Sequence, residues 1–441
     1  MHQRDIYRFW SPLFASWLLM AVEGPLISAV INRLGDEVIM LAAQGLVMSL
    51  SVIIESPVIN LLATTTTLAQ DRPSYLLIRK FTLHLMILLT AITLLFSYTG
   101  LFDMVVTGWM GVPAQVSEWV RPGIRIMIVW SAAIGWRRFL QGILIRFGQT
   151  RKIAWGTAVR LVATGSSALS LALWSGWPGV SIGATSVMTG VISESLFITL
   201  VTRPVIKKEL GPDCPTAQGK PLTYRDLFWF HLPLAGTSLL LLLVQPMVAT
   251  SLARLDNPML SLAAWPIVFQ ASLIARSPAS ALPEVVIALT RGRETLRPIR
   301  RFVLFLAAAN TIVMALFLFT PLIDMYLLRV QDATAVVAEI AHSGLIFFLL
   351  LPALFVLISW LRGLLIKTRS TRVVNAGMFV NLAVTAAILV LGVLLKMDGI
   401  PTAAIALNSA ALIELAILWR GVQPSLQEIS QPPIVPVSLR F

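Results

Sequence analysis

The sequence has little charge, one cysteine and few histidines, and each shortage excludes a class of protein. Only 12% of the 441 residues are charged, about half of the roughly 25% found in soluble domains. The single cysteine, Cys214, excludes an intramolecular disulfide framework and a thiolate metal cluster built from this chain alone. The four histidines lie far apart without a His-x-x-x-His pair, so the sequence predicts no metal ligands.

Motifs for catalysis and phosphate binding are also missing. The sequence contains no His-Glu-x-x-His or Gly-x-Ser-x-Gly, and the Gly219-Lys220 pair is followed by Pro221 where a phosphate-binding loop needs Ser or Thr. We therefore expect no catalytic residues and no cofactor, and a membrane-embedded enzyme is a minor alternative. The net charge of +13 could suggest nucleic acid. We expect no such partner, because basic cytoplasmic loops are the commoner cause in a membrane chain.

What the sequence does contain is long apolar runs, with 57% hydrophobic residues and a mean hydropathy of +0.83. Runs of about 20 such residues cross a bilayer. The sequence therefore predicts an all-α polytopic membrane protein that has the lipid bilayer as its partner and is a monomer. Breaks at charged residues, Pro and Gly divide it into twelve transmembrane helices, at 8–34, 37–69, 75–101, 118–147, 152–176, 180–203, 226–254, 258–290, 299–328, 334–366, 371–396 and 400–420.

The basic residues predict the orientation of these spans. If the N-terminus is cytoplasmic, 23 of the 34 Lys and Arg fall in cytoplasmic segments and 5 in external segments. Such a bias is the positive-inside signal of membrane proteins. We therefore expect a protein integral to the cell (inner) membrane with both termini in the cytoplasm.

The chain is an internal repeat. When Pro12 is placed on Pro233, the sequence lies over itself without a gap from about 12 to 164. Apolar composition alone does not match Pro, Arg, Asp, Gly and Glu in one register. The matched pairs are Pro25 and Pro246, Arg33 and Arg254, Ser56-Pro57 and Ser277-Pro278, Asp103 and Asp324, Gly142 and Gly363, and, after one deletion near 180, Glu194 and Glu414.

Each copy holds six spans, an even number, so both copies enter the membrane from the same side. Such parallel repeats are related by an axis along the membrane normal, with substrate near the midplane between them. The sequence thus predicts an N-terminal six-helix lobe (1–203), a polar cytoplasmic linker (204–223), a C-terminal six-helix lobe (224–422) and a flexible, extended cytoplasmic tail (423–441).

Charged residues inside spans are candidates for function, because a charge in hydrocarbon costs at least about 2.5–3.5 kcal/mol. The repeat matches Glu55 to Arg276 near the midplane, each followed by Ser-Pro. The pair has three interpretations: an ion pair that clamps the two lobes, a substrate or gating role, or separate solvation.

A second group is basic. Arginines deep in the spans suit a carboxylate or phosphate, since the guanidinium presents a fixed fork of donors. The alternative is that they pair with Glu55, Glu284, Glu194 and Glu414. The predicted substrate-binding residues are Arg137, Arg138, Gln141, Arg160, Glu55, Arg276, Arg362 and Asn381.

Three carboxyl groups are candidates for coupling to H⁺ or Na⁺. Glu194 and Glu414 occupy matching places in the sixth and twelfth spans, and Glu23 precedes Gly24-Pro25 in the first. A buried carboxyl group can carry a proton. A hydrogen bond that packs helices explains each of them equally well.

Three segments carry a family resemblance: LAAQGLVMSL (41–50), ESP (55–57) and RRFLQGILIRFGQTRKIAWGTAVRL (137–161). They resemble the MATE-like branch of the multidrug/oligosaccharidyl-lipid/polysaccharide (MOP) exporter superfamily, and within it the progressive-ankylosis (ANK) type proteins. Major facilitators, the competing twelve-helix architecture, carry a glycine-containing motif between the second and third spans. The loop 68–80 lacks those glycines.

The resemblance implies a V-shaped pair of six-helix bundles that exports its substrate by rocker-switch alternating access. ANK-type proteins are associated with anions such as citrate, nucleotides or pyrophosphate, and typical MATE proteins expel cationic drugs using sodium or protons. The position of the usual MATE coupling Asp falls here on Ile27, and the nearest acid is Glu23. This departure favours a small organic or phosphorylated anion. Cation-coupled multidrug efflux and the flipping of a lipid-linked saccharide are the alternatives.

The charge bias gives a test of topology. Cysteines introduced at Gln149 and Gly219 should be protected from membrane-impermeant thiol reagents in intact cells, whereas one at Gly179 should react. Labelling at Gly219 from outside would overturn the orientation.

Overall fold

The computed structural model describes residues 3–212, 221–255, 257–290, 292–368 and 370–430, and within these ranges it contains helices and no strand. The first half consists of α1 Gln3–Ile31, α2 Glu37–Ile59, α3 Leu61–Leu68, α4 Arg72–Tyr98, η1 Asp103–Trp109, α5 Ala114–Ile126, α6 Trp130–Arg146, α7 Thr150–Trp174 and α8 Gly179–Glu209. The second consists of α9 Tyr224–Leu242, α10 Val244–Leu252, α11 Pro258–Ser280, α12 Leu282–Leu289, α13 Arg293–Phe319, α14 Leu322–Asp324, η2 Met325–Val330, α15 Ala335–Leu345, η3 Ile346–Phe348, α16 Leu351–Lys367, α17 Thr371–Leu394 and α18 Gly399–Ser430.

The helix bounds recur in the register of the sequence repeat. The first residues of α2, α3, α4, α6 and α7 are those that the register pairs with the first residues of α11, α12, α13, α16 and α17, as Thr150 pairs with Thr371. Helices α8 and α18 begin at Gly179 and Gly399, which are offset from this register by a single position. The offset falls where the sequence alignment needs one deletion. Each half is therefore built from the same succession of helices.

The helices long and apolar enough to cross a membrane number ten among the described residues, or eleven if the bent pair formed by 335–348 and 351–367 is one span. The one expected span outside this count, the fourth at 118–147, is divided into α5 and α6 by a turn at 127–129. The linker and tail predictions also need correction. Helix α8 continues to Glu209 and α18 to Ser430, so parts of both segments are helical, whereas 213–220 and 431–441 lie outside the described residues.

Local sequence explains where the long helices begin. Before α4, Asp71 accepts a hydrogen bond from the backbone N–H of Ser74 at 3.0 Å, and the Ser74 hydroxyl accepts one from the Asp71 N–H. Thr223 and Asp226 form the same reciprocal pair before α9. These capping boxes satisfy N–H groups that the first helical turn leaves free.

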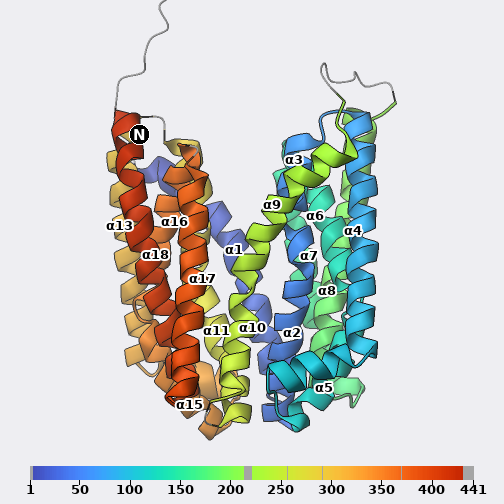
Figure 1. Ribbon diagram of the computed structural model, residues 1–441, viewed down its shortest axis with the longest axis vertical. Helices are drawn as coiled ribbons and strands as arrows, with labels where there is room; N and C mark the ends of the chain where they lie inside the picture. The colour runs from blue at the N-terminus through green and yellow to red at the C-terminus, as the bar shows by residue number, and fades with distance from the viewer. Residues whose placement is uncertain (1–2, 213–220, 256, 291, 369, 431–441) are drawn as a thin grey trace, which may run out of the picture.

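Two bundles splay apart toward the end that carries the N-terminus and the start of α9, and α5 and α15 lie at the opposite end (Figure 1). Helices α1 and α9 run between the bundles, and each begins against the half to which it does not belong. In α1, Trp10 Nε1 donates to the Pro278 carbonyl at 3.0 Å. In α9, His231 lies 2.9 Å from Thr64 Oγ1 and 2.8 Å from the Pro57 carbonyl. The halves are thus joined by exchanged first helices.

Near the centre, α2 and α11 approach each other closely. A Cβ atom on Gly45 would lie 2.6 Å from Cγ of Pro266. The missing side chain of Gly45 lets the two helices meet, so the halves are in direct contact at this level.

At the end that carries α5 and α15, two repeat-related arginines hold the halves together. Arg33, just after α1, donates to the carbonyls of Arg329 and Val330 at 2.9 and 3.1 Å, at the end of η2. Its repeat mate Arg254, just after α10, donates to the carbonyl of Trp109 at the end of η1. Each half therefore supplies an arginine to the other, and these reciprocal arginine contacts close this end.

Substituting both arginines should loosen this end. In the Arg33→Gln/Arg254→Gln variant, spin labels at Gln115 and Val336, which are exposed and occupy repeat-related positions at the starts of α5 and α15, should report a longer and broader distance distribution by double electron–electron resonance. The reason is that charge-assisted donors between the halves are lost.

The matched control is Arg121→Gln, which breaks the ion pair with Asp103 inside one half. It should leave the distribution unchanged. Equal distributions in the double variant and the wild type would show that the arginine contacts do not hold the halves together.

Candidate functional site

A cavity of about 350 Å³ lies between the two halves. Its walls come from α1, α2 and α8 of the first half and from α9, α10 and α11 of the second. Polar side chains line it, together with the rings of Trp265 and Phe269; they are Glu23, Ser28, Gln44, Ser49, Gln245 and Gln270. This is the place between the repeats at which substrate is expected.

Some of the polar atoms in this cavity are bonded to each other and some are free. Ser28 Oγ donates to Gln270 Oε1 at 2.9 Å, and Trp265 Nε1 donates to Gln245 Oε1 at 3.2 Å. By contrast, Gln44 Oε1 and Ser49 Oγ are buried without a hydrogen-bond partner. A buried polar atom without a partner is costly, so these two atoms keep an unused hydrogen-bonding capacity beside the cavity, with the Gln44 carboxamide packed against Gly183 of α8.

Glu23 faces the cavity but is held by the first half. Arg160 of α7 donates to both its oxygens, from Nε at 2.9 Å and from Nη2, and Thr164 Oγ1 donates to Oε1 at 2.9 Å. Gly190 on α8 leaves room for the Thr164 hydroxyl, which a Cβ at that position would meet. The negative charge of Glu23 is therefore balanced by Arg160, and its carboxylate is held in one orientation.

A buried network continues from Arg160 into the first half. Glu194 on α8 accepts hydrogen bonds from Arg137 Nη1 and, at 3.1 Å, from Gln141 Nε2, both on α6. Arg160 Nη1 lies 3.9 Å from the same carboxylate. The ion pairs thus connect α1, α7, α8 and α6, and their charges balance within the protein.

The second half has a smaller network at the matching place. Glu414 on α18 accepts from Arg362 of α16, with Nε at 2.9 Å, and from Asn381 Nδ2 of α17 at 2.9 Å. Of the two interpretations of the deep arginines, pairing with glutamates holds for Arg137, Arg160 and Arg362.

The ion pair considered between Glu55 and Arg276 is not formed. Glu55 lies in the first half near Arg137, Arg138 and Arg160, with Oε2 buried and without a hydrogen bond. The Arg276 guanidinium lies in the second half, 4.4 Å from the ring centre of Phe355. Each charge lies among residues of its own half, so the match in sequence does not bring the two together.

Two of the predicted substrate-binding arginines have no carboxylate partner among the residues that the structure describes. Within the described residues, Arg138 and Arg276 make no ion pair with a carboxylate, and the Nε atom of each is buried without a partner. The rings of Phe269 and Phe355, at 5.7 and 4.4 Å, flank Arg276, and such cation–π contacts stabilise a guanidinium without neutralising it. Among the predicted substrate-binding arginines, these two are the ones whose charge no carboxylate balances in the part of the chain that the structure describes.

The structure assembles the predicted residues differently from the expectation. Glu23 lines the central cavity, whereas the predicted arginines do not belong to the described lining. Three uncharged residues of the lining are further functional candidates: Gln44, Gln245 and Gln270. They were missed because the charge of residues inside spans guided the prediction. Three glutamines within apolar runs were the available signal, because amides too are expensive in hydrocarbon.

Comparison with known proteins identifies the fold. No protein-family model matches the sequence, and no curated protein is similar to it in sequence. Solved structures do match along nearly the whole chain. The MATE transporter VcmN of Vibrio cholerae, in a mutant form, has a TM-score of 0.69 at 16% identity over 97% of each chain. An outward-facing multidrug resistance MATE family transporter of the MOP superfamily has a TM-score of 0.68 at 14% identity over 98% of this chain and 97% of that one.

A MOP superfamily transporter from Pyrococcus furiosus, whose binding pocket is described as reversed in polarity, matches with a TM-score of 0.62 at 14% identity over 97% of this chain and 96% of that one. These likenesses show that the chain has the fold of the MATE transporters, as the sequence resemblance predicted.

The buried ion pairs should be structural. Glu414→Gln leaves the Arg362 charge without its partner, so we expect the free energy of unfolding to fall by about 3–5 kcal/mol. Adding Arg362→Gln should restore most of that loss. Thermal and denaturant unfolding of the purified variants measures both effects.

Glu209→Gln serves as the control, because it removes a carboxylate from the exposed pair with Lys208 and should cost less than about 1 kcal/mol. If Glu414→Gln were as stable as the wild type, the pair would not hold α16 against α18.

Proposed function

We propose that the protein is a secondary active transporter that works by alternating access and exports its substrate. The observation that carries the proposal is the interface between the two halves, which we call the seam. It is closed at one end by the reciprocal arginine contacts and contains a central cavity with unpartnered polar atoms. The bundles diverge at the other end (Figure 1). A MATE fold whose known structures face either way supports this interpretation.

The substrate class we propose is a small organic or phosphorylated anion. Its support is that Arg138 and Arg276 make no ion pair within the described residues, and the Nε atom of each is buried without a partner. A guanidinium binds a carboxylate or phosphate through paired hydrogen bonds. The ANK-type resemblance is kept here as a proposal of the same kind.

Coupling to H⁺ or Na⁺ is proposed to use Glu55. The three other candidates, Glu23, Glu194 and Glu414, are each held by an arginine and a second donor. Glu55 is buried and keeps an oxygen without a partner, so a bound proton or sodium ion would complete its contacts rather than compete for them.

The runner-up function is cation-coupled multidrug efflux, which is favoured by the aromatic and amide lining of the central cavity. A flippase for lipid-linked saccharides requires a wide basic cavity. The described lining of the central cavity contains no arginine. The enzyme alternative gains nothing from the comparisons, because the matching structures named above are transporters. Membership of the inner membrane, a monomeric state and the absence of a cofactor remain proposals.

The substrate proposal is tested in two steps. A thermal-shift screen of the purified protein against citrate, nucleotides, pyrophosphate, cationic drugs and lipid-linked sugars selects the ligand. In proteoliposomes, Arg138→Gln and Arg276→Gln should then each lower uptake at least about tenfold, because a lost charge-assisted hydrogen bond is worth roughly 1.5–3 kcal/mol. Glu55→Gln should remove the dependence on a pH or sodium gradient.

The control is Arg300→Gln, an exposed arginine at the start of α13, and folding of each variant is checked by size-exclusion chromatography. A cationic hit, or a folded Glu55→Gln/Arg276→Gln variant with normal uptake, would reject the anion proposal.

A further inference from the structure

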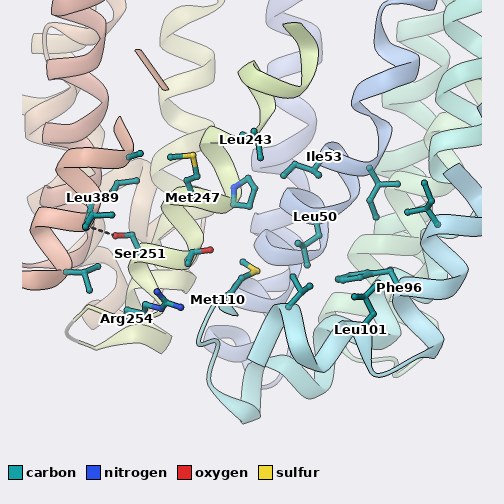
Figure 2. A pocket seen from close by; sticks show the side chains of 18 of the residues that line it. Leu50, Ile53, Phe96, Leu101, Met110, Leu243, Met247, Ser251, Arg254 and Leu389 are labelled. Carbon is teal, nitrogen blue, oxygen red and sulfur yellow. Dashed lines mark hydrogen bonds between the residues drawn. The ribbon is translucent and has the colours of Figure 1, made fainter. Parts of the chain in front are cut away.

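A second, larger cavity lies at the seam, apart from the central cavity. Its volume is about 630 Å³, within the roughly 300–1,000 Å³ range of ligand sites. One wall comes from α2, α4 and η1 of the first half, and the other from α10 and α17 of the second. Figure 2 shows the side chains of Leu50, Ile53, Phe96, Met247 and Leu389 directed into it.

The lining is almost entirely hydrocarbon, and its rim faces the bilayer. Ile92 on α4 and Leu394 on α17, which lie on opposite rims, are 41% and 73% exposed. Both helices are long and apolar enough to span the membrane. The cavity is therefore an apolar groove that opens between the halves toward lipid. We refer to it below as the seam groove.

A single cation lies among the described residues of the lining. Arg254 lies at one end of the groove (Figure 2). One of its Nη atoms donates to the Trp109 carbonyl. Trp109 is largely exposed, and exposed tryptophans are typical of the membrane surface. Arg254 thus combines an exposed guanidinium at headgroup depth with an apolar channel that runs below it.

We propose that the seam groove binds a phospholipid with an anionic headgroup. One acyl chain fills the groove between α2 and α17, and the phosphate is bound by Arg254. The chemistry matches at both ends: an apolar wall for the chain, and a guanidinium, which binds phosphate through paired hydrogen bonds. The described lining contains Arg254 and no acidic residue, so it favours a headgroup whose phosphate charge is not offset by a cation. Both halves form the walls of the groove. The lipid therefore binds while the reciprocal arginine contacts hold the halves together.

Native mass spectrometry of the full-length protein in detergent tests the proposal, with dioleoyl phosphatidylglycerol and dioleoyl phosphatidylcholine as probes. The wild type should retain phosphatidylglycerol about fivefold better, the effect of one basic residue at a lipid surface. Arg254→Gln should abolish this preference while both lipids still bind. Ile53→Trp, which fills the groove, should reduce the retention of both.

Two matched controls separate lipid binding from loosening of the seam. Arg33→Gln removes the repeat mate of Arg254, which does not line the groove, and should keep the preference. Val162→Trp, on a bilayer-facing position of α7 that is 71% exposed, should leave retention unchanged. Equal retention of the two lipids by the wild type would overturn the proposal, as would normal retention by Ile53→Trp. Displacement of the lipid by citrate or pyrophosphate would also overturn it and would make the groove a substrate site.

Discussion

A guanidinium inside a bilayer needs an acceptor within reach, and this constraint organises both halves of the protein. Charges in hydrocarbon are costly, and a buried pair that loses one partner leaves the other stranded. Arg137, Arg160 and Arg362 therefore join helices to glutamates, and these pairs fix α6, α7 and α8 and their counterparts in the second half. Arg138 and Arg276, which make no ion pair within the described residues, are informative for the same reason.

The repeat preserves the chemistry of each network but not the positions of its parts. In the register of the repeat, Gln141 corresponds to Arg362 and Arg160 to Asn381, so each of these positions carries an amide in one half and a guanidinium in the other. Each carboxylate still receives one guanidinium and one amide. The first half alone has Glu23, where the second half has Val244. The difference brings one acid from the first half to the central cavity and makes the two sides of the seam unequal.

The sequence was sufficient for the fold because its signals are periodic and long. Apolar runs located the helices, and the register of Pro, Arg and Gly pairs located the repeat to within a single position of the observed bounds. Contacts between halves could not be predicted in the same way. Glu55 and Arg276 were matched by the repeat, yet an axis between the halves keeps equivalent positions apart unless they lie on it. The cavity-lining glutamines were missed because amides carry no charge, although their burial is nearly as constrained.

Arg254 links two features of the seam that are otherwise separate. One of its donors closes the end between the halves through Trp109, and its position also makes it the basic group of the seam groove. A ligand shifts a conformational equilibrium only by its difference in affinity for the two states. The groove has walls from both halves, so it keeps its shape only while the halves stay as they are. A lipid bound there must stabilise the closed end, and opening this end during transport requires the groove to release or rearrange its lipid.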